Sequence, residues 1–511
     1  MADKNLRYTG AGNRVQMPDR FSRRNFVRAM GAMAAGSVLH QTSGCKRSTT
    51  SQPDSPSAGP ADYTLTIAVK PVELAPNRII STTTYNGQFP GPLLRFKEGQ
   101  AVTVDIHNET DTPEQLHWHG QFLSTDVDGA AEEGTPFIPA HGSRRITFVP
   151  KPSGYRFYHT HVHAAANLNA GQYTGLVGPV YIEPRNNPGN YDREIFLTLK
   201  EFEPTFSRGG DMAMDFLSPS ATIKELKDSG ESAMNASLAA GSPHGFEVGY
   251  GSFTINGRML GSGEPIRVKP GERVLFHVLN GSATEIRSLA LPGHSFTVVA
   301  MDGNPLPKPV TVPGLWLGTA ERISAIVEMN HPGVWIMGDT ANDDREHGMG
   351  TVVEYTDAKG RPQWIAPKPF QWNYAQFGNA AAVPAPDQIF DMTFAKQNAA
   401  DGGFNRWTIN GVAFAEDHMQ PMFRVTQGKR YRLRMRNASD DIHPVHLHRH
   451  SFELTRVAGQ PTSGLSKDVV MLGGYQEVEI DFVADNPGLT LFHCHQQLHM
   501  DFGFMALFEY S

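Results

Sequence analysis

The sequence predicts an all-β protein made of three related domains. Its 511 residues are enough for about three domains of ordinary size. The 50 glycines and 36 prolines favour a turn-rich β-protein over a helical one. From Tyr63 onward apolar residues alternate with small or polar ones, which places Leu65, Ile67 and Val69 on one face of a predicted strand.

A ten-residue pattern that runs from Gly to Asn occurs three times. The copies are Gly99–Asn108, Gly271–Asn280 and Gly428–Asn437. Each copy follows an Asn-Gly pair, the strongest short signal for a two-residue β-hairpin turn, at Asn86-Gly87, Asn256-Gly257 and Asn410-Gly411. Such internal repetition predicts homologous units. We therefore expect three β-domains at 62–185, 186–358 and 385–511, with a linker at 359–384.

Residues 1–45 have the features of a twin-arginine signal peptide. Ser22–Arg28 contains the paired arginines and is followed by a weakly apolar stretch, Ala29–Leu39, that is too short to span a bilayer. Gly44-Cys45 and the Ser/Thr/Pro-rich linker at 46–61 resemble a lipoprotein cleavage site and tether. Thr42 stands where such sites usually have Leu, so a lipid anchor at Cys45 and its absence are both left open. We expect export by the twin-arginine route to the periplasm or cell envelope.

Charge and cysteine content exclude several classes of protein. The chain carries a net charge of -7, and without residues 1–44 it has 38 basic and 50 acidic residues. No basic tract remains, which argues against a nucleic-acid partner. Two cysteines, Cys45 and Cys494, cannot form a disulfide framework. The oligomeric state is not encoded in any motif, and we favour a monomer.

Histidine pairs of the form His-x-His mark the first and third copies. Nine residues after the repeat Asn stand His117-Trp118-His119, Leu289-Ala290-Leu291 and His446-Leu447-His448, in that order. Five residues after a turn glycine stand His159-Thr160-His161, Gly338-Asp339-Thr340 and His493-Cys494-His495. The middle copy has no pair, and we interpret it as a spacer that sets the geometry of the outer two.

Four such pairs with one cysteine predict copper. Each pair puts two imidazoles on one face of a strand, and eight imidazoles suit three metal ions held by three, three and two histidines. In an extended strand Cys494 points away from His493 and His495, so one strand would connect two metal sites by a short covalent path. A thiolate with histidines favours copper, whereas structural zinc is tetrahedral and needs no eight-histidine array.

These motifs together resemble those of three-domain multicopper oxidases of the bacterial laccase-like kind. The resemblance covers nearly all of 62–511 and rests on His117–Gly120, His159–His161, His443–His448 and His493–His499. It implies three cupredoxin-like Greek-key β-barrel domains and four copper ions. The implied ligands are His443, Cys494 and His499 for the type 1 copper, His117 and His446 for the type 2 copper, and His119, His159, His161, His448, His493 and His495 for the type 3 pair. The division of those six between the two type 3 ions stays open.

Phe504 departs from the family pattern. The family's axial methionine lies ten residues after the cysteine, where this chain has Phe504, so a three-coordinate type 1 copper of raised potential is expected. Met505 is the alternative ligand, although a shift of one residue turns a side chain to the other face of a strand. We expect electrons to enter through an exposed His499 or His443.

Asp128 matches an acid that the family places nine residues after His119. The resemblance gives it the role of orienting a copper-bound water and relaying protons, and an ordinary turn aspartate is the alternative. Catalytic roles are also implied for Cys494, His493 and His495, which link the two centres. The family's second acid is replaced by Met500, and the neighbouring Asp501 is a candidate substitute. We interpret His450 as structural and His163 as structural or exposed.

The implied activity couples one-electron oxidation of phenols or aromatic amines to the four-electron reduction of O2 to water. One alternative is a metallo-oxidase for Cu(I) or Fe(II) in copper tolerance, with Met212 and Met214 as candidate substrate ligands. Another is a non-catalytic periplasmic copper-binding scaffold. A copper nitrite reductase would leave the eight cluster ligands unexplained.

Overall fold

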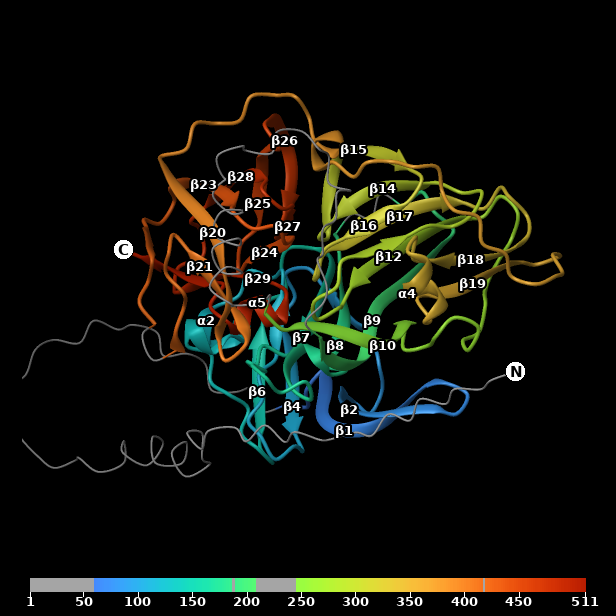
Figure 1. The fold of residues 1–511 in the computed structure, drawn as a ribbon, viewed down its shortest axis with the longest axis horizontal. Coiled ribbons are helices and arrows are strands. Elements are labelled where there is room, and N and C mark those ends of the chain that lie inside the picture. Colours follow the sequence, from blue (N-terminus) through green and yellow to red (C-terminus); the bar gives the residue numbers. More distant parts are fainter. Residues whose placement is uncertain (1–58, 186–188, 208–244, 417–418) are drawn as a thin grey trace, which may run out of the picture. The chain divides into compact units, whose positions relative to one another are not determined.

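The computed structural model describes residues 59–185, 189–207, 245–416 and 419–511, and this part of the chain consists mainly of β-strands (Figure 1). The predicted all-β class is confirmed. The predicted leader with Cys45 and the segment with Met212 and Met214 lie outside the described residues. Among the described residues, no helix combines the length and apolar character that a membrane crossing requires.

The first domain packs two sheets against each other. Its strands are β1 (Tyr63–Ala75), β2 (Arg78–Tyr85), β3 (Leu94–Lys97), β4 (Val102–Asn108), β5 (His117–His119), β6 (Ser143–Phe148), β7 (Gly154–His159) and β8 (Val177–Glu183). The sheet orders are β2-β1-β4-β6 and β3-β8-β7-β5. Short helices in the loops are α2 (Thr125–Asp128), η1 (Ala131–Glu133) and η2 (Gly171–Tyr173). Leu65, Val104, Trp118 and Val180 from both sheets meet in the core.

The second domain has its largest sheet in the order β10-β9-β12-β17-β14-β15. Its elements are β9 (Arg193–Ser207), β10 (Glu247–Ile255), β11 (Ile266–Val268), β12 (Arg273–Asn280), β13 (Arg287–Leu289), β14 (Phe296–Met301), β15 (Asn304–Val312), β16 (Leu315–Leu317), β17 (Arg322–Glu328), β18 (Val334–Gly338), α4 (Asn342–Glu346) and β19 (Gly350–Tyr355). The segment that leads to the third domain contains η3 (Tyr374–Phe377).

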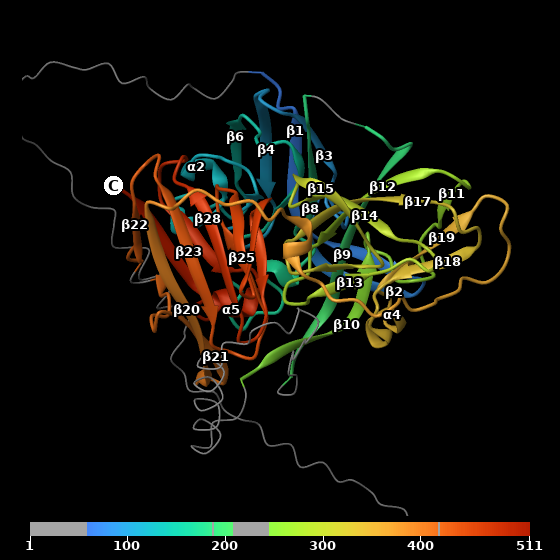
Figure 2. The same cartoon turned by 90° about the horizontal axis from the view of Figure 1, so that it is seen from above.

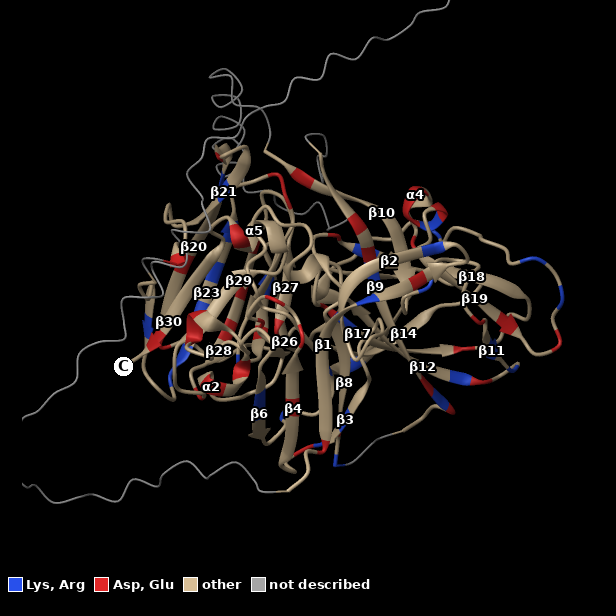
Figure 3. Cartoon of the chain, turned by 90° about the horizontal axis from the view of Figure 1, so that it is seen from below, with Lys and Arg blue, Asp and Glu red and all other residues tan. Residues whose placement is uncertain are grey.

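The third domain again has two sheets. Its elements are β20 (Gln388–Asp401), β21 (Phe404–Ile409), β22 (Phe423–Val425), β23 (Arg430–Asn437), β24 (His443–Leu447), β25 (Phe452–Val457), β26 (Gln460–Lys467), β27 (Val469–Leu472), β28 (Glu477–Val483), β29 (Thr490–Cys494), α5 (Gln497–Asp501) and β30 (Met505–Tyr510). The sheet orders are β21-β20-β23-β28-β25-β26 and β22-β30-β29-β24-β27. Arginines of β23 lie beside acidic residues of β28, as Arg432 does with Asp481 at 2.6 Å (Figure 3).

The three repeat strands pair alike in their domains. Each lies parallel to the first long strand, as β4 to β1, β12 to β9 and β23 to β20. The three Asn-Gly turns all have positive φ at the Asn, at Asn86 (54°), Asn256 (52°) and Asn410 (53°), which confirms the predicted turn chemistry. Each of these Asn side chains accepts a hydrogen bond from a backbone N–H of the first strand, as Asn410 does from Thr393 at 2.8 Å.

The Asn that ends each repeat strand ties the strand to the loops beside it. In the second domain the buried Asn280 donates from Nδ2 to the carbonyls of Glu285 and Leu317, both at 2.9 Å, and accepts from the N–H of Ser282 at 3.0 Å. Asn108 and Asn437 make the corresponding bonds in their domains. This amide fixes the loop after which the histidine pairs of the outer domains begin.

The alternation expected from Tyr63 holds only for the first half of β1. Leu65 and Ile67 are buried, but the Val69 residue is 57% exposed. Pairing with β4 ends at Ile67, and farther along β1 the side chains of Val72 and Leu74 pack with residues of the second domain such as Leu279. The strand therefore passes from one core to another, and its buried face changes where it does so.

The third domain lies beside the first (Figures 1 and 2). Arg449 donates from Nε to the carbonyl of Leu123 at 2.9 Å, and the N–H of Leu491 donates to Glu133 at 2.7 Å. These bonds are buried, so they fix the approach of the two domains.

Replacing Asn280 by Ala should lower the free energy of unfolding by about 2–4 kcal/mol, because two buried carbonyls lose their donor. The exposed Asn330 of the same domain is the matched control. Asn330→Ala should change the free energy of unfolding by less than about 0.5 kcal/mol. Denaturant unfolding of both variants measures the difference. Equal effects would contradict the structural role of the repeat Asn.

Glu114 predicts a pH dependence of stability. It is buried and accepts a hydrogen bond from the hydroxyl of Thr160 at 3.0 Å. Burial raises the pKa of its carboxyl from 4.5 to about 7. The folded state thus keeps the proton while the unfolded chain ionises, so this contribution to stability is lost as pH rises from about 4.5 to about 7.

The variant Glu114→Gln cannot ionise and should therefore gain stability relative to the wild type, by about 3 kcal/mol, over that pH interval. Denaturant unfolding at a series of pH values tests this, with the exposed Glu109→Gln as control. A difference between Glu114→Gln and wild type that stays constant with pH would refute the assignment.

Candidate metal centre

The histidine pairs of each outer domain lie on adjacent antiparallel strands. His117 of β5 is opposite His159 of β7, and His446 of β24 is opposite His493 of β29. The second histidine comes directly after its strand ends in two of the pairs, at His448 and His495, and two residues after the end of β7 at His161. All eight side chains are at most 2% exposed.

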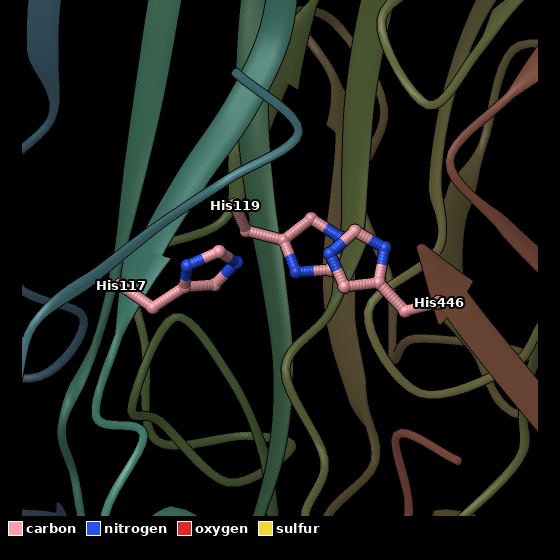
Figure 4. A group of neighbouring side chains, drawn as sticks. All are labelled: His117, His119 and His446. Carbon is pink, nitrogen blue, oxygen red and sulfur yellow. The ribbon is translucent and has the colours of Figure 1, made fainter. Parts of the chain in front are cut away.

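Eight histidines from the two outer domains form three groups, and in each group one ligand atom of every residue lies within 4.8 Å of the others. Two of the groups share His119. The groups are His119, His159 and His495; His161, His448 and His493; and His117, His446 and His119. Figure 4 shows the last group, in which the rings of His119 and His446 stack at 3.8 Å. The geometry thus divides the six histidines whose split the sequence left open.

The hydrogen bonds of these histidines suit a metal site. Nδ1–H donates to a backbone carbonyl in His117 (Asp128, 2.9 Å), His159 (Thr160, 2.8 Å), His446 (Asp468, 2.7 Å) and His493 (Cys494, 2.9 Å). A carbonyl only accepts, so each Nε2 is left with a lone pair. The buried Nε2 atoms of His117, His159 and His446 have no hydrogen-bond partner. His448 and His493 bring two Nε2 atoms to within 3.0 Å of each other, a pairing that a cation between them would relieve.

Burial favours the neutral form of five of the cluster histidines. Desolvation, and then the neighbouring imidazoles, hold the pKa well below its ordinary value in His119, His161, His446, His448 and His495. Neutral imidazole is the form that binds a metal ion. The residues present therefore fit a histidine-rich metal cluster.

A second centre surrounds Cys494, the one free cysteine of the described residues. Its Sγ lies 3.5 Å from Nδ1 of His499 and 3.8 Å from Nδ1 of His443, and the two Nδ1 atoms are 3.2 Å apart. Nε2 of His443 contacts the hydroxyl of Ser439 at 2.9 Å. Burial raises the pKa of the Cys494 thiol, so metal binding here requires loss of a proton.

Phe504 and Met505 lie on different sides of the chain beyond α5. The Phe504 ring is 4.8 Å from that of His443, and its carbonyl accepts from the N–H of Cys494 at 3.1 Å. Met505 packs in a separate apolar cluster with Leu491 and Leu507. Phe504 therefore borders the cysteine group, and Met505 faces away from it.

The expectation of an exposed His499 or His443 is wrong, because they are 1% and 0% exposed. The indole of Trp407, on β21, lies against both rings, with centroids 4.2 Å from His499 and 4.8 Å from His443. Trp407 comes from an earlier hairpin of the same domain. The motifs that contain His443 and His499 therefore gave no indication that an indole covers these rings.

Asp128 lies at the histidine cluster. Its Oδ2 is 3.0 Å from Nδ1 of both His117 and His448, and its Oδ1 is buried without a hydrogen-bond partner. Glu133, which no sequence motif marks, has Oε1 3.6 Å from Nδ1 of His448. Burial, and then the charge of Asp128, raise the pKa of Glu133 well above its ordinary range. Two acids thus approach the same histidine.

Asp501 does not take the place of Met500. It accepts from the N–H groups of Ala164 and Ala165 at 3.0 and 2.7 Å, and among the described residues the histidine that its carboxylate approaches is His163, at 3.8 Å. A further acid beside a cluster histidine is Glu132, whose carboxylate lies 3.7 Å from Nδ1 of His161.

Two other histidines have partners outside the cluster. His163 contacts Glu132 at 2.8 Å and has a side chain that is 19% exposed. His450 contacts the hydroxyl of Tyr510 at 2.6 Å, as His294 does that of Tyr355 in the second domain.

The second domain has no histidine pair at the matching positions. Leu289 and Leu291 are fully buried there in the apolar core. Among the described residues, every group of metal-ligand side chains found comes from the first domain, the third domain or both.

Family models described as multicopper oxidase match residues 67–187, 222–356 and 383–511. Among curated proteins, the multicopper oxidase MmcO of Mycobacterium tuberculosis is 29% identical over 524 residues, which cover 96% of this chain and 97% of that protein.

Two solved structures share the fold at low identity. The laccase of Botrytis aclada has a TM-score of 0.69 at 19% identity and covers 88% of this chain and 87% of its own. A Campylobacter jejuni multicopper oxidase described as a metallo-oxidase has a TM-score of 0.64 at 18% identity, with 89% and 93% covered. These neighbours confirm the cupredoxin-like architecture. The chain therefore belongs to the multicopper oxidase family, in its three-domain bacterial laccase-like form, whose members bind four copper ions.

Proposed function

We propose that this multicopper oxidase is a laccase-like enzyme that oxidises phenols or aromatic amines and reduces O2 to water. The observation that carries the proposal is Phe504, which borders the cysteine group at the position of the family's axial methionine. A methionine thioether there would lower the reduction potential of the copper, and phenylalanine cannot do so. Phenols hold their electrons more tightly than Cu(I) or Fe(II) does, so a site of raised potential suits them.

The proposed ligands follow the groups described above. His443, Cys494 and His499 would hold the type 1 copper, and His117 and His446 the type 2 copper. The type 3 pair would be held by His119, His159 and His495 on one ion and by His161, His448 and His493 on the other. When bound, copper supplies one-electron oxidation of the donor and four-electron reduction of O2. Cys494 is joined through the backbone to His493 and His495, which gives the two ligand groups a path of few bonds.

Asp128 has two proposed tasks. Oδ2 accepts from Nδ1–H of His448 and so orients that imidazole. Oδ1 is free to accept from a water in the cluster, and the reaction needs four protons for each O2. Glu133, whose pKa burial raises well above its ordinary range, lies beside Asp128 and is the next proton carrier.

Charge near the cysteine group is partly neutralised, which lowers the attraction of this region for a metal cation. Asp440 and Asp441, which precede His443, both bind Nζ of Lys396 at 2.6 Å. This ammonium reduces the pull of the two carboxylates on a substrate cation. A metallo-oxidase remains the second candidate, because a structural neighbour bears that description.

The expected twin-arginine export, periplasmic or envelope location and lipid anchor at Cys45 remain proposals. They rest on the paired Arg23 and Arg24 and on the Gly44-Cys45 pair.

Oxygen uptake by the copper-loaded protein tests the activity. A dimethoxyphenol should support fast uptake, and Cu(I) or Fe(II) should support little. The reverse preference would make the protein a metallo-oxidase. A blue protein that consumes no oxygen with any donor would leave a copper-binding scaffold.

The variant Phe504→Met tests the role assigned to the axial position. A thioether beside the copper stabilises Cu(II), so the reduction potential should fall, and phenol oxidation should slow with it. Redox titration of the blue absorption band gives the potential. Phe508→Met, at a buried position of β30 packed against Phe423, is the control and should leave it unchanged. An unchanged or higher potential in Phe504→Met would contradict the assignment.

A further inference from the structure

Six charged side chains from all three domains are buried together behind His119 and His446. They are Arg156 of β7, Asp302, Glu321 and Arg322 of the second domain, and Lys467 and Asp468 of the third, and each is at most 1% exposed. Burying charge is costly unless every group is paired. Here three cations meet three anions.

Asp468 is the centre of this network. Its Oδ1 accepts from Nη1 of Arg322 at 2.6 Å, and its Oδ2 accepts from Nη2 of Arg322 at 2.7 Å and from Nη1 of Arg156 at 3.2 Å. A two-pronged bond of this kind between guanidinium and carboxylate fixes geometry as well as charge.

Asp468 also bonds two proposed copper ligands at once. Oδ1 is 3.1 Å from Nε2 of His119, and the backbone carbonyl accepts from Nδ1 of His446 at 2.7 Å. Carboxylate and carbonyl oxygens only accept, so both imidazole hydrogens point at Asp468. The opposite nitrogens, Nδ1 of His119 and Nε2 of His446, are buried and have no hydrogen-bond partner.

The second domain holds the main chain of this residue too. Oδ2 of Asp302 accepts from the N–H groups of Asp468 at 3.2 Å and Val469 at 3.1 Å, while Oδ1 accepts from the N–H of Arg322 at 3.0 Å. Both the side chain and the backbone of Asp468 are therefore fixed from the domain that has no copper ligand.

Gly120 of the His117–Gly120 motif lies against the network. Its φ is +77°, and a Cβ there would lie 2.5 Å from Oδ2 of Asp468 and 2.8 Å from Nη2 of Arg322. No side chain fits at this position while Asp468 and Arg322 keep their places. The glycine of the motif is thus explained by the charge network.

We propose that Asp468 is a positioning residue for the copper ligands His119 and His446, and that Arg322 of the second domain holds it in place. The inference rests on the proposed copper-binding role of the two histidines. It gives the middle domain a task beyond spacing the outer two.

Asp468→Asn tests the proposal in the copper-loaded protein. The amide keeps the shape, but it loses the charge and places an N–H donor against Arg322 or His119. Copper retention at the cluster against a chelator should weaken about 10- to 100-fold. The EPR signal of the type 2 copper should change, while the blue band of Cys494 should remain, because Asp468 bonds none of the three type 1 ligands.

Arg322→Lys tests the same assignment with the charge preserved, and Arg287→Lys is the matched control. Arg287 is equally buried in the second domain and pairs with Asp344 at 2.6 Å, away from the copper ligands. Both variants lose a buried guanidinium, but only Arg322→Lys should alter the type 2 signal and copper retention.

Two results would overturn the proposal. One is an Asp468→Asn protein that keeps its copper with an unchanged type 2 signal. The other is an equal loss in Arg322→Lys and Arg287→Lys, which would reduce the effect to general destabilisation. Copper content and EPR require no turnover, so the outcome does not depend on which donor the enzyme oxidises.

Discussion

A neutral imidazole has one N–H, and in a buried metal site that hydrogen must go to an acceptor outside the site. For six of the eight cluster histidines the acceptors are backbone carbonyls of Asp128, Thr160, Asp468 and Cys494, and carboxylates of Asp128 and Asp468. The four carbonyls lie at the ends of helices or strands, where the regular pattern of hydrogen bonds stops. The strand ends of the two outer domains therefore supply both the histidines and the groups that orient them.

The middle domain shows how a repeated fold divides its tasks. Leu289 and Leu291 occupy the positions of a histidine pair and extend an apolar core. The repeat Asn and its turn are retained, so the architecture persists without the metal chemistry. What this domain gives to the site comes from Asp302 and Arg322, at the side that faces the two other domains.

The sequence was sufficient to predict those features of the site that depend on the local spacing of residues. The histidine pairs, the opposite orientation of Cys494 and the place of Phe504 all follow from counting residues along strands. Contacts between distant segments left no such sign. Trp407 covers His499 from another hairpin, Glu132 approaches His161 from a loop, and Asp468 owes its place to a second domain. Contacts between distant segments leave no trace in the two-residue periodicity of a strand.

The charge network behind the cluster also affects how the protein matures. Asp468 belongs to the last domain to be synthesised, and its two arginines come from the other two. Until all three domains have docked, one of these charges lacks its partner, and His119 and His446 lack a common anchor. In a chain with one misfolded domain the histidine cluster should therefore be poorly formed. Retention of copper at the cluster then reports that all three domains have folded correctly.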